Sequence, residues 1–151
     1  INCAQPGDIL VLSAGNNPQQ GGFGDVLASA CMGRGIKALI IDAGVRDGRG
    51  LRKSGFPVFC LGLSIKGTSK ETLGSVNQPV VIGGELISPG DIVVADDDGV
   101  VVVRKDPVEL AAACQRREDA EAAMIESHMR GVLTFDERYE SIRNKGATYV
   151  D

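Results

Sequence analysis

Short apolar runs separated by polar, glycine-rich turns form the main pattern along the chain, and they predict strands alternating with helices. Three continuous apolar runs, Ile9–Ser13, Ala38–Ile41 and Pro57–Leu61, are typical of buried strands. Between the first two, Phe23–Gly35 carries apolar side chains at helical spacing and ends in glycines. A shorter helix that ends at Gly55 is predicted before the third run. This β-α-β-α-β order favours parallel strands with helices packed on the sheet.

The pattern changes in the middle of the chain, where Val80–Ile82, Asp91–Ala95 and Val100–Arg104 are β-rich segments separated by turn residues. The turn Asp97-Asp98-Gly99 between two valine-rich runs is a strong hairpin signal. The acidic triplet that begins at Asp96 could also form a cation site, but we interpret it as a solvated turn. We therefore predict an α/β fold, a sandwich-like β/β/α arrangement that mixes a parallel βαβ part with an antiparallel hairpin part.

A long helix is predicted from Asp106 to about Arg130, with Asp106 as its N-cap and Pro107 at its first helical position. A last short helix should dock through three spaced apolar or aromatic side chains, Phe135, Tyr139 and Ile142. We expect one domain over residues 1–151. Because the chain opens with Ile1 rather than Met and runs directly into a strand-like segment, we also expect that an N-terminal portion precedes it.

Composition and charge exclude several classes of protein. The net charge is −4 and only 4% of residues are aromatic, which argues against nucleic-acid binding, because such proteins need basic and stacking surfaces. We see neither an apolar run of about 20 residues, which would predict a membrane span, nor a secretory leader. The cysteines lack CxxC spacing, so we interpret all of them as reduced core residues of a cytoplasmic protein: Cys3, Cys31, Cys60 and Cys114.

Two polar clusters follow the first two predicted strands, where parallel α/β folds place their sites. The first is the glycine-rich loop that ends at Asp25, and the second runs from Ala43 to Gly48. At the predicted helix start, the backbone N–H groups of Val26 and Leu27 lack helical acceptors and suit a carboxylate ligand. The alternative is that Asp25 only caps the helix.

Arg46 and Asp47 supply the second cluster with an adjacent cation and anion in a glycine-flanked turn. A guanidinium fork suits a carboxylate or an enolate oxygen. The carboxylate offers hard oxygens of the kind that Mg²⁺ or Mn²⁺ prefers. Taken alone, such a pair could equally be an ordinary surface ion pair.

The spacing D-x20-R-D joins the two clusters, within the segment GGFGDVLASACMGRGIKALIIDAGVRD. With GFPVFCLG and PGDIVVADDDGVVVV, this segment resembles the 4-hydroxy-4-methyl-2-oxoglutarate / 4-carboxy-4-hydroxy-2-oxoadipate aldolases, which share the RraA-like fold of regulator of ribonuclease activity A. The resemblance implies homotrimers or homohexamers with sites between subunits. It implies that Asp47 binds Mg²⁺ or Mn²⁺, that Asp25 holds the waters of that metal, that Arg46 binds the oxo and hydroxyl oxygens of the substrate, and that the Val26 and Leu27 amides hold its pyruvyl carboxylate.

The long helix carries one more candidate, because Glu121 lies within an apolar stripe and Glu118 at the edge of that stripe. An unpaired carboxylate there would be costly to bury, so it needs a partner. The resemblance implies an acidic residue that reaches a neighbouring subunit's site, with Glu121 the nearer match and Glu118 the second choice. The alternative for Glu121 is a salt bridge with Arg117. For His128 we expect a capping or packing role.

With this resemblance, the features predict a cytoplasmic, divalent-metal-dependent aldolase that releases pyruvate from 4-hydroxy-2-oxo diacids such as 4-hydroxy-4-methyl-2-oxoglutarate and also decarboxylates oxaloacetate. A Schiff-base aldolase that uses Lys37 or Lys66 is the weaker enzymatic alternative. A non-catalytic regulator that binds a ribonuclease or helicase shares the fold and stays open as the second reading.

Overall fold

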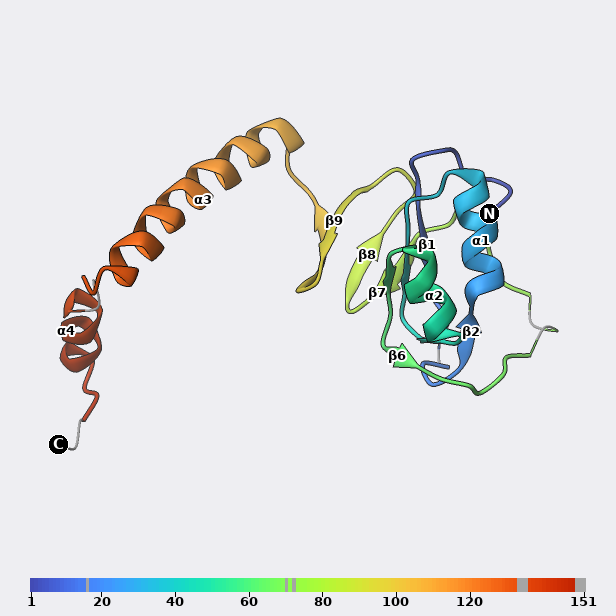
Figure 1. Ribbon diagram of the computed structural model, residues 1–151, viewed down its shortest axis with the longest axis horizontal. Coiled ribbons are helices and arrows are strands. Elements are labelled where there is room, and N and C mark those ends of the chain that lie inside the picture. The colour runs from blue at the N-terminus through green and yellow to red at the C-terminus, as the bar shows by residue number, and fades with distance from the viewer. Residues whose placement is uncertain (16, 70, 72, 133–135, 149–151) are drawn as a thin grey trace. The chain divides into compact units, whose positions relative to one another are not determined.

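The computed structural model describes residues 1–15, 17–69, 71, 73–132 and 136–148. It divides into two compact units, Ile1–Val103 and Arg104–Asp151 (Figure 1). Our prediction of one domain over residues 1–151 therefore stays a prediction, and the parallel and hairpin parts both belong to the first unit.

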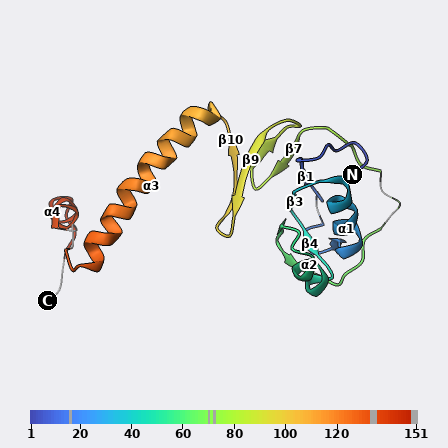
Figure 2. The same ribbon diagram turned by 45° about the horizontal axis from the view of Figure 1, so that its top comes forward.

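A parallel three-stranded sheet is formed by the apolar runs that the sequence indicated. It has the order β1 (Ile9–Leu12), β3 (Ala38–Ile41) and β5 (Val58–Phe59). Every side chain of β3 is buried, as expected for the central strand of a sheet covered on both faces. Helices α1 (Asp25–Arg34) and α2 (Gly48–Ser54) contact each other, and Figure 2 shows them close together. The predicted parallel βαβ part is confirmed.

A second parallel sheet was not predicted. It has the order β2 (Gly21–Phe23), β4 (Gly44–Val45) and β6 (Gly62–Leu63). We had assigned β2 to loop and helix, and had merged β5 and the approach to β6 into one strand. Strands of two or three residues that contain glycine carry no hydrophobic periodicity, so only their pairing identifies them.

The core of the first unit lies around β3 and α1. Phe23 and Leu39 are almost fully buried, and the Phe23 ring stacks on Phe56 with 6.2 Å between ring centroids. Cys31 is buried, and this burial raises the pKa of its thiol. Our assignment of Cys3 and Cys114 to the core was wrong, because both are exposed, whereas Cys60 is partly buried and packs against the core. Apolar neighbours in sequence do not ensure burial, because the fold decides which face of a segment is covered.

Two antiparallel hairpins complete the first unit. One pairs β7 (Val80–Ile82) with β8 (Glu85–Ile87), and the other pairs β9 (Ile92–Asp96) with β10 (Gly99–Val103). We predicted the second hairpin but missed β8. Asp96 Oδ1 accepts hydrogen bonds from the Asp98 and Gly99 amides, at 2.9 and 3.3 Å. The acidic triplet thus forms a turn, and the mixed parallel and antiparallel fold is confirmed.

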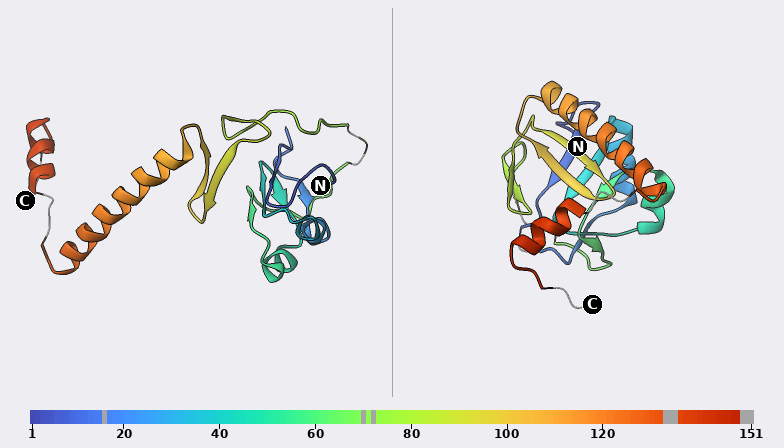
Figure 3. Two further views of the ribbon diagram at one scale, coloured as in Figure 1. Left: turned by 90° about the horizontal axis from the view of Figure 1, so that it is seen from above. Right: turned by 90° about the vertical axis from the view of Figure 1, so that its left-hand side faces the viewer.

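The second unit consists of α3 (Pro107–Met129) and α4 (Asp136–Asn144). The Asp106 side chain accepts hydrogen bonds from the Val108 and Glu109 amides, so the predicted N-cap is confirmed. Helix α3 is continuous (Figure 3) and has no buried side chain. Of the three predicted docking side chains, Phe135 lies outside the described residues, whereas Tyr139 and Ile142 are about half exposed. No helix among the described residues combines the length and apolar character needed to cross a membrane.

Candidate functional site

The two polar clusters meet because β2 and β4 pair in parallel, with Gly21 opposite Gly44 and Phe23 opposite Val45. Asp25 follows β2 and Arg46 follows β4, so their strands end at one sheet edge. A backbone hydrogen bond of 2.8 Å from the Arg46 amide to the Phe23 carbonyl closes this edge. The buried strands that precede the two clusters, β1 and β3, also pair in parallel. The short second sheet, which the sequence did not predict, adds the pairing directly beside the clusters.

Gly24 is the centre of the cluster. It is buried, and a Cβ built on it would collide with Asp47 Oδ2 and lie 3.1 Å from Arg46 Cγ and 3.2 Å from Arg46 Nε. Arg46 Nη1 donates a hydrogen bond of 3.1 Å to the Gly21 carbonyl, and Arg46 Nε lies 3.6 Å from Asp47 Oδ2. The absence of a side chain at Gly24 therefore lets the carboxylate and the guanidinium lie directly against the start of α1.

Asp47 has an unusual backbone conformation for a residue other than glycine, with φ 56° and ψ 36°. It is the N-cap of α2, and its carbonyl accepts a hydrogen bond of 2.9 Å from the Leu51 amide. Its side chain makes no capping hydrogen bond and is 43% exposed. A left-handed backbone conformation raises the free energy of most residues other than glycine, and this cost is smaller for aspartate. Here it aims the carboxylate toward Gly24, away from the helix that it begins.

Asp25 is the first residue of α1 rather than its N-cap, which is Gly24. Our capping alternative for Asp25 was therefore wrong, because its side chain lies against α2 instead of the α1 amides. A Cβ built on Gly50 would collide with Asp25 Oδ2 and lie 3.0 Å from Asp25 Cγ. The carboxylate thus packs against the backbone of α2, and Gly50 provides the space.

The start of α1 offers the donors that the sequence indicated. The first helical hydrogen bond runs from the Ala28 amide to the Gly24 carbonyl, at 3.0 Å. The amides of Val26 and Leu27 precede it and have no acceptor within the helix. Both residues are exposed, with 75% of Val26 and 39% of Leu27 accessible to solvent. An anion placed here would meet backbone donors and the positive end of the helix dipole.

The donor set suits a hydrated divalent cation better than a fully protein-enclosed one. Among the described residues, no group of three or more His, Cys, Asp or Glu side chains could hold a metal ion. Asp47 nevertheless presents a hard carboxylate oxygen beside Gly24, and Asp25 presents a second one against Gly50. Mg²⁺ commonly binds one or two carboxylates and keeps several waters, so these residues fit such an ion.

Glu121, the remaining candidate, belongs to the second unit. Its Oε1 accepts a 2.7 Å hydrogen bond from Arg117 Nε within α3, and its side chain is 51% exposed. The salt bridge that we considered as the alternative is therefore present in the single chain. Glu118 is also exposed. Neither carboxylate is desolvated here, so an active-site role for Glu121 stays a prediction about the oligomer.

Gly24 and Gly50 are the site residues that the sequence argument did not assign. The motif Gly21-Gly22-Phe23-Gly24 was the available signal, and we had interpreted its glycines as giving a ligand access to the backbone. Gly24 instead admits the protein's own Asp47 and Arg46.

Comparison with known proteins assigns the chain to a family. The family model described as "RraA-like: Aldolase/RraA" matches residues 1–102, nearly the whole of the first unit. A protein of Halalkalibacterium halodurans described as "Putative 4-hydroxy-4-methyl-2-oxoglutarate aldolase" is 36% identical over 121 residues, which is 79% of this chain and 58% of that protein. The chain thus spans less than two thirds of this relative.

Two solved structures extend the comparison. An uncharacterized protein from Pseudomonas syringae pv. tomato superposes with a TM-score of 0.74 at 31% identity, covering 87% of this chain and 66% of that one. RraAS2 of Streptomyces coelicolor, described as an unusual member of the RNase ES inhibitor RraA protein family, superposes with a TM-score of 0.67 at 34% identity. That match covers 85% of this chain and 65% of that one.

Proposed function

The chain belongs to the RraA-like family, and from this premise we propose that it is a divalent-metal-dependent pyruvate aldolase that acts on 4-hydroxy-2-oxo diacids such as 4-hydroxy-4-methyl-2-oxoglutarate. The observation that carries the proposal is the close approach of Asp47 and Arg46 to Gly24, directly beside the unbonded amides of α1. A guanidinium and a carboxylate thus lie beside the residue that precedes the amide donors, and we take this carboxylate as the metal ligand.

Each group has a defined part in the proposed reaction. The Val26 and Leu27 amides bind the carboxylate next to the oxo group, and the Arg46 guanidinium binds the oxo and hydroxyl oxygens. Asp47 would hold a Mg²⁺ or Mn²⁺, and Asp25 would accept hydrogen bonds from the waters of that ion. When bound, such an ion supplies Lewis-acid stabilisation of negative charge on the oxo oxygen.

The proposed chemistry is a retro-aldol cleavage. The C4 hydroxyl loses its proton, the C3–C4 bond breaks, and its electron pair passes into the enolate of pyruvate, which is then protonated at C3. Fixed positive charge from Arg46 stabilises the oxygen on which negative charge develops. Glu121 of a neighbouring copy assists removal of the hydroxyl proton. Decarboxylation of oxaloacetate passes through the same enolate, so we expect it as a second activity.

A coupled pyruvate assay over a panel of 4-hydroxy-2-oxo diacids and oxaloacetate tests the proposal, with and without Mg²⁺ or Mn²⁺. We expect pyruvate release only with metal, and none in excess EDTA. Full turnover in EDTA would refute the metal-dependent mechanism. Inactivation by borohydride only in the presence of substrate would point to a Schiff-base lysine instead.

We also propose that the active form is a homotrimer or homohexamer in the cytoplasm. The support is α3, a helix of 23 residues that buries no side chain in the single chain while exposing Ile125, Met124 and Met129. Apolar side chains on a long exposed helix favour burial against a second copy. Light scattering that shows a monomer at micromolar concentration would contradict this.

The second candidate function is a non-catalytic regulator of a ribonuclease, which the likeness to RraAS2 favours. Such a role does not require Asp25, Arg46 and Asp47 together. Failure to release pyruvate from any tested diacid, combined with inhibition of a ribonuclease by both the wild-type protein and an Asp47→Ala variant, would establish it in place of the aldolase.

A further inference from the structure

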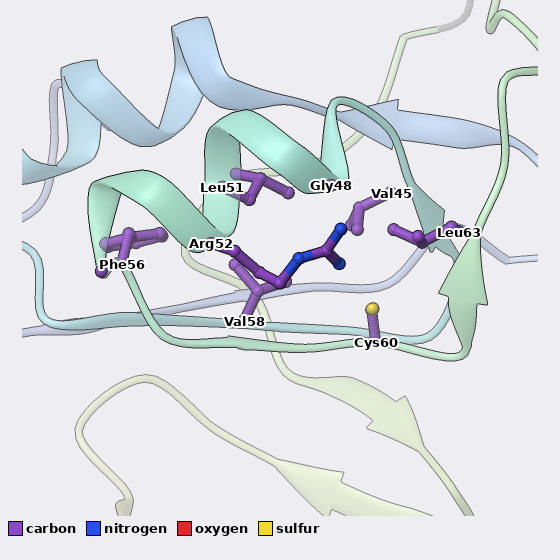
Figure 4. A pocket seen from close by; sticks show the side chains of 9 residues that line it. Val45, Gly48, Leu51, Arg52, Phe56, Val58, Cys60 and Leu63 are labelled. Atoms are coloured by element: carbon purple, nitrogen blue, oxygen red, sulfur yellow. The ribbon is translucent and has the colours of Figure 1, made fainter.

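A pocket lies beside α2, and none of the proposed catalytic side chains lines it (Figure 4). Its volume is about 350 Å³, at the lower end of the range for small-molecule sites. Its walls are mainly aliphatic and aromatic, with one cation and one thiol among them. The lining residues are Val45, Gly48, Leu51, Arg52, Gly55, Phe56, Val58, Cys60 and Leu63.

Helix α2 separates this pocket from the Asp25 carboxylate. Gly48 and Arg52 are four residues apart and share the helix face that lines the pocket, and Gly55, the residue that caps the C-terminus of α2, completes that side. Gly50 faces another way, because its backbone meets Asp25. The pocket is therefore a separate site rather than an extension of the Asp25, Arg46 and Asp47 cluster.

The charge of the pocket comes from Arg52 alone. In Figure 4 its guanidinium lies between α2 and the segment that carries Cys60 and Leu63. Arg52 makes no side-chain hydrogen bond or ion pair with any residue that the structure describes, and no carboxylate lines the pocket. A guanidinium on an apolar wall is complementary to a single carboxylate that carries an apolar body.

Gly48 brings two walls of the pocket close together. A Cβ built there would lie 2.9 Å from Leu63 Cδ2 and 3.4 Å from Arg52 Nη1. The glycine thus allows Leu63 and the Arg52 head group to approach the first turn of α2 together. One apolar wall and the cationic group meet at this point.

We propose that this pocket binds a small amphipathic monocarboxylate, with the carboxylate on Arg52 and the apolar body against Leu51, Val58 and Leu63. The aliphatic walls offer no partner for a second charge on the ligand. The ligand class therefore differs from the diacids proposed for the catalytic site, and the inference does not depend on the aldolase function.

The Cys60 thiol provides a direct readout, because it lines the pocket and is partly exposed. Iodoacetamide labelling of the whole protein, followed peptide by peptide by mass spectrometry, measures its reaction rate. Cys3 is exposed and lies outside both the pocket and α3, so it serves as the internal reference. Hexanoate at about ten times its Kd should slow Cys60 labelling by about tenfold without affecting Cys3. Hexanol at the same concentration should protect much less, since it lacks the carboxylate.

Arg52→Gln should abolish protection by hexanoate, while Arg49→Gln, on the same helix but outside the pocket lining, should retain it. Thermal melting tests whether both variants fold. If Arg52→Gln does not fold, Arg52→Lys takes its place; because it keeps the charge, it should retain part of the protection. Equal protection by hexanol, or undiminished protection in Arg52→Gln, would overturn the proposal. Cys60 labelling that occurs only after dilution dissociates the oligomer would also overturn it, because this would mean that a second copy covers the pocket in the oligomer.

Discussion

Replacement of Gly24 by alanine is the most informative single change, because it adds one methyl group at the centre of the proposed site. The backbone there is extended, with φ −152° and ψ −173°, a conformation that alanine adopts freely. Backbone strain therefore contributes nothing to the effect. The new Cβ would collide with Asp47 Oδ2 and crowd Arg46 Cγ and Nε at 3.1 and 3.2 Å.

The size of the effect follows from these contacts. The Asp47 carboxylate must move by about 1 Å to restore an ordinary contact, and a misplacement of that size costs on the order of 10²-fold in turnover. The crowded carboxylate is the free end of a side chain that is 43% exposed, so the free energy of unfolding should fall by less than the roughly 1–3 kcal/mol that overpacking costs in a core. Because Asp47 is the proposed metal ligand, Mn²⁺ affinity should fall in parallel.

Pyruvate release, Mn²⁺ affinity and thermal melting should be measured together for Gly24→Ala. Gly33→Ala is the matched control, since Gly33 lies within α1 and a Cβ there would meet no atom within 4 Å. It should stabilise the helix by about 1 kcal/mol and leave turnover unchanged. If Gly24→Ala folds and keeps wild-type turnover and metal affinity, the close approach of Asp47 to Gly24 has no role in catalysis.

Four further substitutions test the site, the α3 carboxylate and the core. Arg46→Lys should lower turnover by about 10²–10³-fold with little change in Mn²⁺ affinity, and retention of a large part of the activity would reassign Arg46 to turn structure. Asp47→Ala should abolish Mn²⁺ binding in calorimetry, which undiminished binding would contradict. Glu121→Ala should lower turnover while light scattering shows an intact oligomer. Its control is Glu126→Ala, which removes the i,i+4 ion pair with Arg130 at the C-terminal end of α3 and should leave turnover unchanged. Leu39→Ala, at a fully buried position, should lower the free energy of unfolding by about 2–5 kcal/mol in denaturant titration, and a loss below that range would place Leu39 outside the core.

The sequence by itself determined the elements whose signals are local. The continuous apolar run of β3 predicts a buried strand wherever it packs, since a strand covered on both faces needs no polar side chain. Asp106 followed by Pro107 marks the start of α3 through hydrogen bonds that span only three residues. The two-residue turn between β9 and β10 is local in the same way.

Only the tertiary structure decided how the site is assembled. The approach of Asp47 to Gly24 joins residues far apart in sequence through the pairing of β2 with β4, two strands too short to show any periodicity. It also decided that Gly24 rather than Asp25 caps α1, because the Asp25 carboxylate packs against Gly50 of α2. Residue types and their spacing identify which groups belong to a site. Their distances and orientations depend on contacts between segments, which local sequence patterns do not encode.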